Sequence, residues 1–240
     1  PAANAATDPA IKVESFLNLC GGTDVAVYPG FDSGLPGQPV GPEENVIKDR
    51  MRTRAIASGY HQAGVNGVYV FNWHANANTR RELLSQIGSI ETLRGTDKIY
   101  AATHRFIVEE GGWRGAYRGD RLRGEVPVPL KRTLTGDGPT ILLNIADDQP
   151  SSAELRVRLQ EWVKGDDVGV WWDGTRLANP DLRFLDPHGI SDVSSAVWIR
   201  FALGEVAPGP HEVKVVLIER HPQLACDLIL TDVELVIRHD

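Results

Sequence analysis

The pattern of hydrophobic and polar residues changes near the middle of the chain. Before about residue 105, hydrophobic residues recur at helical spacing in segments that are separated by short apolar runs. From about residue 113 onwards they alternate with polar residues, the period of two that is typical of strands with one buried face. The sequence therefore predicts an α/β region followed by an all-β region.

The first region alternates helices with strands. Helices are predicted over 8–20, 42–62 and 79–87, and short apolar strands over 25–28 and 67–71. The first helix begins with an Asp-Pro pair, the second ends before a glycine, and the third opens with capping-box spacing. Such alternation is typical of parallel strands joined by right-handed crossovers. Because a complete β/α barrel takes about 250 residues, we expect a partial β/α barrel.

The second region predicts roughly eight short strands. Leu155, Val157 and Leu159 alternate with charged residues, and Asp173-Gly174 is a two-residue hairpin turn signal. This pattern favours an antiparallel β-sandwich that resembles a jelly roll. We expect two domains, a partial barrel over 1–110 and a sandwich over 111–240.

Composition excludes several classes of partner. The 240-residue chain has a formal charge of -7 and no basic block, which argues against nucleic acid. No apolar run reaches the roughly 20 residues that a membrane span needs, so we expect a soluble protein. No metal-ligand spacing is present, and we expect no cofactor. The first residue is a proline, which leaves open a secreted or periplasmic protein whose leader has been removed. Cys20 and Cys226 fall in different regions, and free thiols are the favoured expectation.

Polar and aromatic side chains follow the two predicted parallel strands. Tyr28 and Asp32 come at and beyond the end of the first strand, and Asn72, Trp73 and His74 come directly after the second. Neighbouring parallel strands lie about 4.8 Å apart and end at the same edge. The sequence therefore predicts that a carboxylate, an imidazole, an amide and an aromatic ring gather at one rim.

Three segments carry a resemblance to a known family. These segments read GVYVFNWH over 67–74, RRELLSQIGSIETLRGTDKIY over 80–100 and VAVYPGFD over 25–32. Together they resemble the end of the glycosyl-hydrolase-like barrels of bacterial carbohydrate-active proteins, in which a β-sandwich follows the barrel. The second region resembles galactose-binding-like accessory modules through its pattern. The resemblance implies glycosidase ancestry and a carbohydrate substrate.

Hydrolysis of a glycosidic bond, the activity that the resemblance implies, requires two carboxyl groups. Asp32 is the candidate acid, base or nucleophile, and His74 and Tyr28 are its candidate assistants. Glu43 and Glu44, at the end of the long loop after the first strand, are candidates for the second carboxylate. The alternatives are that Asp32 is a turn residue bonded to its own loop and that His74 bonds nearby backbone.

Three residues are candidate substrate contacts. Asn72 suits a sugar hydroxyl, with a strand cap as its alternative, and Trp73 offers a face for a pyranose, with core packing as its alternative. Trp171 and Trp172 are adjacent in a predicted strand and must point to opposite faces. The outward ring of that pair, for which Trp172 is the candidate, is the third substrate contact.

Two other functional hypotheses stay open. In the first, the barrel segment is a scaffold and the protein is a non-catalytic module that binds carbohydrate or another protein. In the second, a homo-oligomer completes the barrel and builds a shared site. A single carboxylate at the predicted rim favours the first of these.

Overall fold

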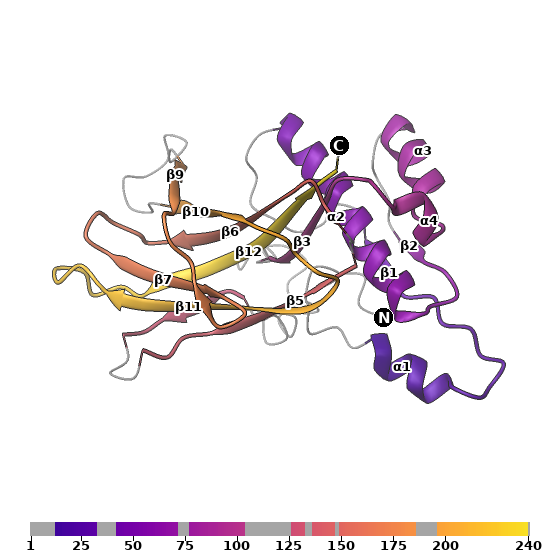
Figure 1. Cartoon of the computed structure of the whole chain (residues 1–240), viewed down its shortest axis with the longest axis horizontal. Coiled ribbons are helices and arrows are strands. Elements are labelled where there is room, and N and C mark those ends of the chain that lie inside the picture. Colours follow the sequence, from indigo (N-terminus) through magenta and orange to yellow (C-terminus); the bar gives the residue numbers. More distant parts are fainter. Residues whose placement is uncertain are drawn as a thin grey trace, which may run out of the picture.

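The computed structural model describes residues 13–32, 42–71, 77–103, 126–132, 136–146, 149–185 and 196–239. Two antiparallel sheets pack face to face as a β-sandwich, and helices cover one outer side of it (Figure 1). The predicted mostly antiparallel second half is therefore confirmed.

The larger sheet contains, among the described residues, six strands: β3 (Lys98–Thr103), β4 (Val128–Leu130), β6 (Ser152–Gln160), β9 (Asp181–Leu185), β10 (Ala196–Leu203) and β12 (Leu228–Arg238). Their order is β3-β12-β6-β10-β9, and β4 pairs with the first residues of β12. All of these pairings are antiparallel.

The smaller sheet consists of β5 (Thr140–Ile145), β7 (Asp167–Trp172), β8 (Thr175–Arg176) and β11 (Gly209–Glu219). The order of these strands is β5-β11-β7-β8, again antiparallel. The chain passes from one sheet to the other between β5, β6 and β7, a connectivity compatible with the predicted jelly roll.

The main core lies between the two sheets and follows the predicted alternation. Leu155, Val157 and Leu159 of β6 are fully buried, as are Val213 and Val215 of β11. Residues between them in the sequence point to the outer faces, because successive side chains of a strand alternate. Burial of this apolar surface provides the main driving force for the sandwich.

The turn between β7 and β8 has the predicted form. Asp173 and Gly174 both have positive φ, 48° and 79°, as a type I′ hairpin turn requires. Asparagine, aspartate and glycine tolerate this conformation best, which is why the dipeptide was informative in the sequence.

The α/β region has the predicted element order. It contains α1 (Val13–Cys20), β1 (Gly30–Asp32), α2 (Pro42–Ala63), β2 (Tyr69–Phe71), α3 (Ala77–Gln86) and the short α4 (Ile90–Leu93). β1 and β2 pair in parallel, as predicted. Gly64 follows α2 with a φ of 92°, the glycine stop that the sequence indicated. These two strands form a parallel pair; they do not show a barrel.

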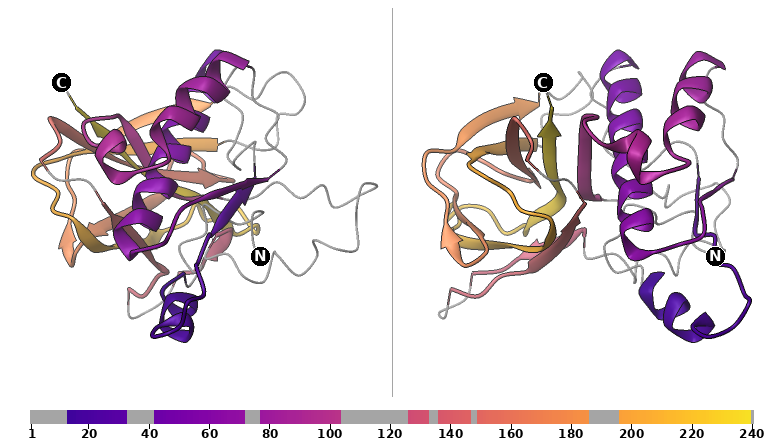
Figure 2. Two further views of the ribbon diagram at one scale, coloured as in Figure 1. Left: turned by 90° about the vertical axis from the view of Figure 1, so that its right-hand side faces the viewer. Right: turned by 45° about the vertical axis from the view of Figure 1, so that its right-hand side comes forward.

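The long helix α2 lies between the sandwich and the β1–β2 pair (Figure 2). On one side its Met51 packs with Ile99 of β3 and Val236 of β12. On the other side its Ala57 and Tyr60 belong to a second small core. Ile87, Leu93, Val70 of β2 and the preceding Val68 belong to the same core. The helix thus has two buried faces, and the one at Met51 covers the outer face of the larger sheet.

Two predicted boundaries are wrong. The segment 25–28 is not a strand, since β1 begins at Gly30, and Val25 and Tyr28 are 61% and 58% exposed. Its apolar composition is typical of a buried strand, yet in the described structure its side chains are largely exposed. α3 begins at Ala77, so Thr79 lies inside the helix and is not its N-cap.

β3 comes from the first part of the chain and hydrogen-bonds to β12 in the larger sheet. The predicted domain boundary near residue 110 falls within 104–125, outside the described residues. None of the helices in the described ranges is long and apolar enough to cross a membrane. Cys20 and Cys226 are both free thiols.

Candidate functional site

The predicted rim lies at the carboxyl ends of β1 and β2. These strands pair in register, with Asp32 opposite Phe71, so both end at the same edge. Asn72 follows Phe71 directly in the chain. The structure describes the backbone of Asp32, whereas Asn72, Trp73 and His74 lie outside the described residues. The shared edge is thus in place, and the grouping of these side chains stays a prediction.

The structure does not bring Tyr28 to this rim. Tyr28 precedes β1 and Asp32 ends it, and four residues of extended chain span roughly 13 Å. The Tyr28 ring lies against Gly67, where an added Cβ would come within 2.9 Å of the ring. Glu43 and Glu44 lie in the first turn of α2, inside the helix that the sequence predicts over 42–62.

The two adjacent tryptophans of β7 point to opposite faces of the smaller sheet, as predicted. Trp172 packs against the main core and stacks on His211, with ring centroids 4.7 Å apart and an interplanar angle of 18°. Trp171 points to the outer face, where it lines a surface hollow. The outward ring of the pair is therefore Trp171, and the expectation that placed Trp172 at this surface is corrected.

The Trp171 ring lies against its own strand at Gly169. A Cβ added at Gly169 would lie 2.5 Å from two carbons of the ring. Any residue larger than glycine at this position would therefore clash with the ring. The guanidinium of Arg176 on β8 lies 5.6 Å from the centroid of the ring, a cation–π contact. Gly169 and Arg176 together fix the position of the Trp171 indole.

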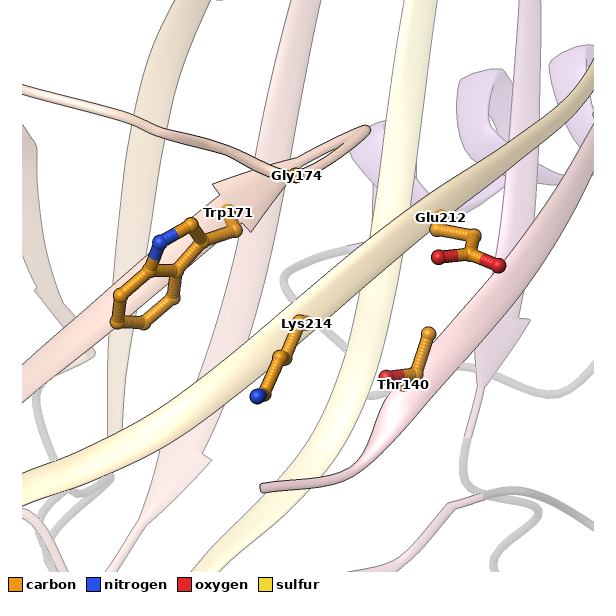
Figure 3. Close-up of a pocket in the computed structure, with 5 residues that line it drawn as sticks. All are labelled: Thr140, Trp171, Gly174, Glu212 and Lys214. Atoms are coloured by element: carbon orange, nitrogen blue, oxygen red, sulfur yellow. The ribbon is translucent and has the colours of Figure 1, made fainter. Parts of the chain in front are cut away.

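The hollow on this outer face has a volume of about 300 Å³. Thr140 of β5, Glu212 and Lys214 of β11, Gly174 of the turn and Trp171 line it. The Lys214 side chain lies between the Trp171 ring and Thr140, and Glu212 lies on the Thr140 side (Figure 3). The hollow therefore offers an aromatic surface, a hydroxyl, an ammonium and a carboxylate.

The charges around the hollow are exposed and weakly paired. The Lys214 ammonium lies 3.8 Å from the Asp137 carboxylate, and both side chains are open to solvent, so the pair stabilises the fold little. Asp173 accepts hydrogen bonds from the backbone N–H of Glu212 at 2.8 Å and from the ring of His211 at 2.7 Å. The Asp173 carboxylate thus holds the β7–β8 turn against β11.

A second group of charged residues lies on the outer face of the larger sheet. Arg52 of α2 forms an ion pair with Glu234 of β12, and both side chains are buried. The Arg158 guanidinium lies 3.6 Å from the Asp232 carboxylate and donates a 2.9 Å hydrogen bond to the Thr231 hydroxyl. Buried ion pairs add little net stability but are costly to break. The pair of Arg52 with Glu234 therefore fixes the position of α2 on the larger sheet.

Burial changes the ionisation of this layer. The pKa of Asp232 is raised to about 6. Desolvation is the largest cause, the neighbouring Glu234 charge adds to it, and Arg158 opposes it. Desolvation also lowers the pKa of Arg158. Within the described residues neither carboxylate oxygen of Asp232 has a hydrogen bond of normal geometry, and the nearby Arg158 and Thr231 only partly offset its desolvation.

No protein-family model matches the chain, and no curated protein matches it either. Within the described ranges, no three histidine, cysteine, aspartate or glutamate side chains gather where they could hold a metal ion.

Four residues near the hollow were not singled out by sequence reasoning: Thr140, Arg176, Glu212 and Lys214. A signal for two of them was present, since Glu212 and Lys214 flank the buried Val213 and must therefore point outwards. The pattern could not show that β5, β7 and β8 bring their side chains to the same place.

Proposed function

We propose that this protein binds carbohydrate on the outer face of its smaller sheet, with the indole of Trp171 as the surface on which a sugar ring stacks. The observation that carries the proposal is an indole that faces a solvent-open hollow and is seated on Gly169. An aromatic ring provides a large, rigid contact area for little loss of conformational freedom. Its flat face suits the apolar face of a pyranose.

The polar groups beside the ring suit the hydroxyls of a sugar. The Glu212 carboxylate accepts hydrogen bonds, the Lys214 ammonium donates them, and the Thr140 hydroxyl does both. A small number of convergent polar groups beside an apolar surface is typical of ligand sites. The proposal corresponds to the non-catalytic binding module that the sequence left open, and it assigns the binding to the outer face of the smaller sheet.

A glycan array followed by calorimetric titration tests the proposal. Trp171→Ala should weaken the binding of the selected glycan by roughly 30-fold, the equivalent of about 2 kcal/mol. Tyr69→Ala removes another exposed aromatic ring, on the β1–β2 pair, and should leave affinity unchanged. Equal affinity of the wild type and Trp171→Ala would reject Trp171 as the platform.

A second candidate function is glycoside hydrolysis at the β1–β2 edge. The parallel register that places Asp32 opposite Phe71, directly before Asn72, favours it. In this proposal Asp32 is the acid, base or nucleophile, and Glu43 or Glu44 supplies the second carboxyl group. The two strands and their helices would then be part of a β/α barrel.

Asp32→Ala tests this second proposal with chromogenic aryl glycosides. Hydrolysis should be abolished while the melting temperature is unchanged, and Asp24→Ala, an exposed aspartate after α1, is the matched control. Turnover that survives Asp32→Ala would remove Asp32 from the mechanism.

The same proposal includes a homo-oligomer that completes the barrel. A two-stranded sheet is marginal alone, and Tyr69 of β2 and Val25, which precedes β1, are exposed. Light scattering after gel filtration would then give a mass above that of one chain. A monomer at all concentrations would exclude the shared barrel.

A further inference from the structure

Four side chains form a straight row across the smaller sheet. Thr140 pairs with Lys214, Lys214 pairs with Trp171, and Trp171 pairs with Arg176 in the strand register. Directly opposite residues on neighbouring strands have Cβ atoms about 4.5–5.5 Å apart. The row thus presents a hydroxyl, an ammonium, an indole and a guanidinium in that order along one line.

The row is positive although the protein is acidic. The chain has a net charge of -7, yet a cation stands on each side of the Trp171 ring. Among the described residues no carboxylate pairs with the Arg176 guanidinium, which contacts the indole of Trp171. The Asp137 partner of Lys214 is 3.8 Å away and exposed, so a ligand can replace it at little cost.

We propose that the ligand of this face is an acidic sugar, a pyranose that carries a carboxylate, as in a uronic acid chain. The inference rests on the proposed carbohydrate binding and names the class of sugar. The indole takes the ring, and Lys214 and Arg176 on either side take carboxylates. Charge-assisted hydrogen bonds from such cations are about twice as strong as neutral ones.

Two other anionic ligands fit the row less well. A small inorganic anion would use the cations but leave the indole without a partner. A single-stranded nucleic acid would also stack on the indole, and the negative charges of Glu212 and of the chain oppose its phosphates as they oppose any polyanion. A uronate differs because its ring hydroxyls can donate hydrogen bonds to Glu212.

Matched oligosaccharides test the inference. Hexamers of galacturonate, glucuronate and mannuronate are titrated into the whole chain beside their methyl esters, which keep the same backbone but lose the negative charge. At least one acid should bind roughly tenfold or more tightly than its ester. Raising the salt concentration should weaken the binding of the acid and leave that of the ester unchanged.

Variants separate the charge from the stacking. Arg176→Gln should lower affinity for the acid by roughly tenfold and leave affinity for the ester within about twofold. Lys214→Gln, at a residue that lines the hollow, should lower affinity for the acid more than affinity for the ester. Trp171→Ala should weaken the binding of both by roughly 30-fold. Because these side chains are solvent-accessible, circular dichroism and melting should show each variant folded.

Each other result overturns the inference. Equal binding of acid and ester, weakened together in Trp171→Ala, would reject the acidic sugar while the carbohydrate site stands. Affinity for the acid that is unchanged in Trp171→Ala would indicate anion attraction without stacking. A dodecamer of thymidylate that binds more tightly than every uronate would assign the face to nucleic acid. If neither acid nor ester binds, the acidic sugar is rejected, and the proposed function itself fails when the glycan array selects no glycan either.

Discussion

Gly169 leaves open the space that the ring of Trp171 occupies on the outer face of the smaller sheet. An added Cβ would lie 2.5 Å from two ring carbons and 3.2 Å from the side chain of Ile218. The atoms in the way are at the far end of the indole, which faces a solvent-open hollow. A larger residue at 169 therefore displaces the ring instead of breaking the strand.

Gly169→Ala should move the Trp171 ring with little loss of stability. We expect the indole N–H resonance of Trp171 to shift in NMR spectra and glycan affinity to fall, while the free energy of unfolding changes by less than about 1 kcal/mol. Gly204→Ala, where an added Cβ would meet nothing within 4 Å, is the control. If the Trp171 indole N–H resonance does not shift in Gly169→Ala, the ring does not rest against Gly169.

The two neighbouring tryptophans should differ in their effect on stability. Trp172→Ala removes a ring packed on the core and stacked on His211, and we expect a loss of about 3 kcal/mol in the free energy of unfolding. Trp171→Ala should cost less than about 1 kcal/mol, because its ring lies on the surface. Urea denaturation measures both, and a larger loss in Trp171→Ala would reverse the assignment of the two faces.

Breaking the buried pair between α2 and the larger sheet should be costly. Arg52→Ala leaves the carboxylate of Glu234 buried without the guanidinium of its ion-pair partner, for which we expect a loss of about 3–5 kcal/mol in the free energy of unfolding. The double variant Arg52→Met with Glu234→Leu should recover most of it, because apolar residues of similar volume often replace a buried pair without loss. Denaturation of the two variants compares them, and an equal loss in both would show that charge is not the cause.

Asp232 should make stability depend on pH in an unusual direction. Its pKa is raised from 3.8 to about 6 in the fold, so between these values the folded protein binds a proton that the unfolded chain has released. Stability therefore falls as pH rises through this window, by about 3 kcal/mol in total at 1.36 kcal/mol for each pH unit.

Asp232→Asn removes this titration. The free energy of unfolding of the wild type, minus that of the variant, should fall by about 3 kcal/mol between pH 3.5 and pH 7. Chemical denaturation at a series of pH values measures this difference. A constant difference would mean that Asp232 titrates alike in the folded and unfolded states.

The sandwich strands and the α/β order were predictable because their signals are local. The alternation around Val157 and Val213, and the Asp173-Gly174 turn, each depend on residues a few positions apart. The prediction for the apolar segment 25–28 is wrong for the same reason, since its composition resembles a buried strand and nothing nearby in the sequence shows that it stays exposed.

The candidate binding face could be predicted only in part. Because Trp171 and Trp172 are adjacent in a strand, one of the two rings must point outwards. Which ring does so depends on which face of the sheet packs against the core. The ion pair of Arg52 with Glu234 was not foreseen, because its partners come from a helix and a strand at opposite ends of the chain.

By itself the sequence determined which segments become strands and helices, where the hairpin turns, and which alternate residues avoid water, because each of these follows from neighbours along the chain. Only the tertiary structure decided that Thr140, Lys214, Trp171 and Arg176 stand in one row. The reason is that register between strands is set by long-range hydrogen bonding and by the packing of one whole face into the core, and neither is encoded in any single segment.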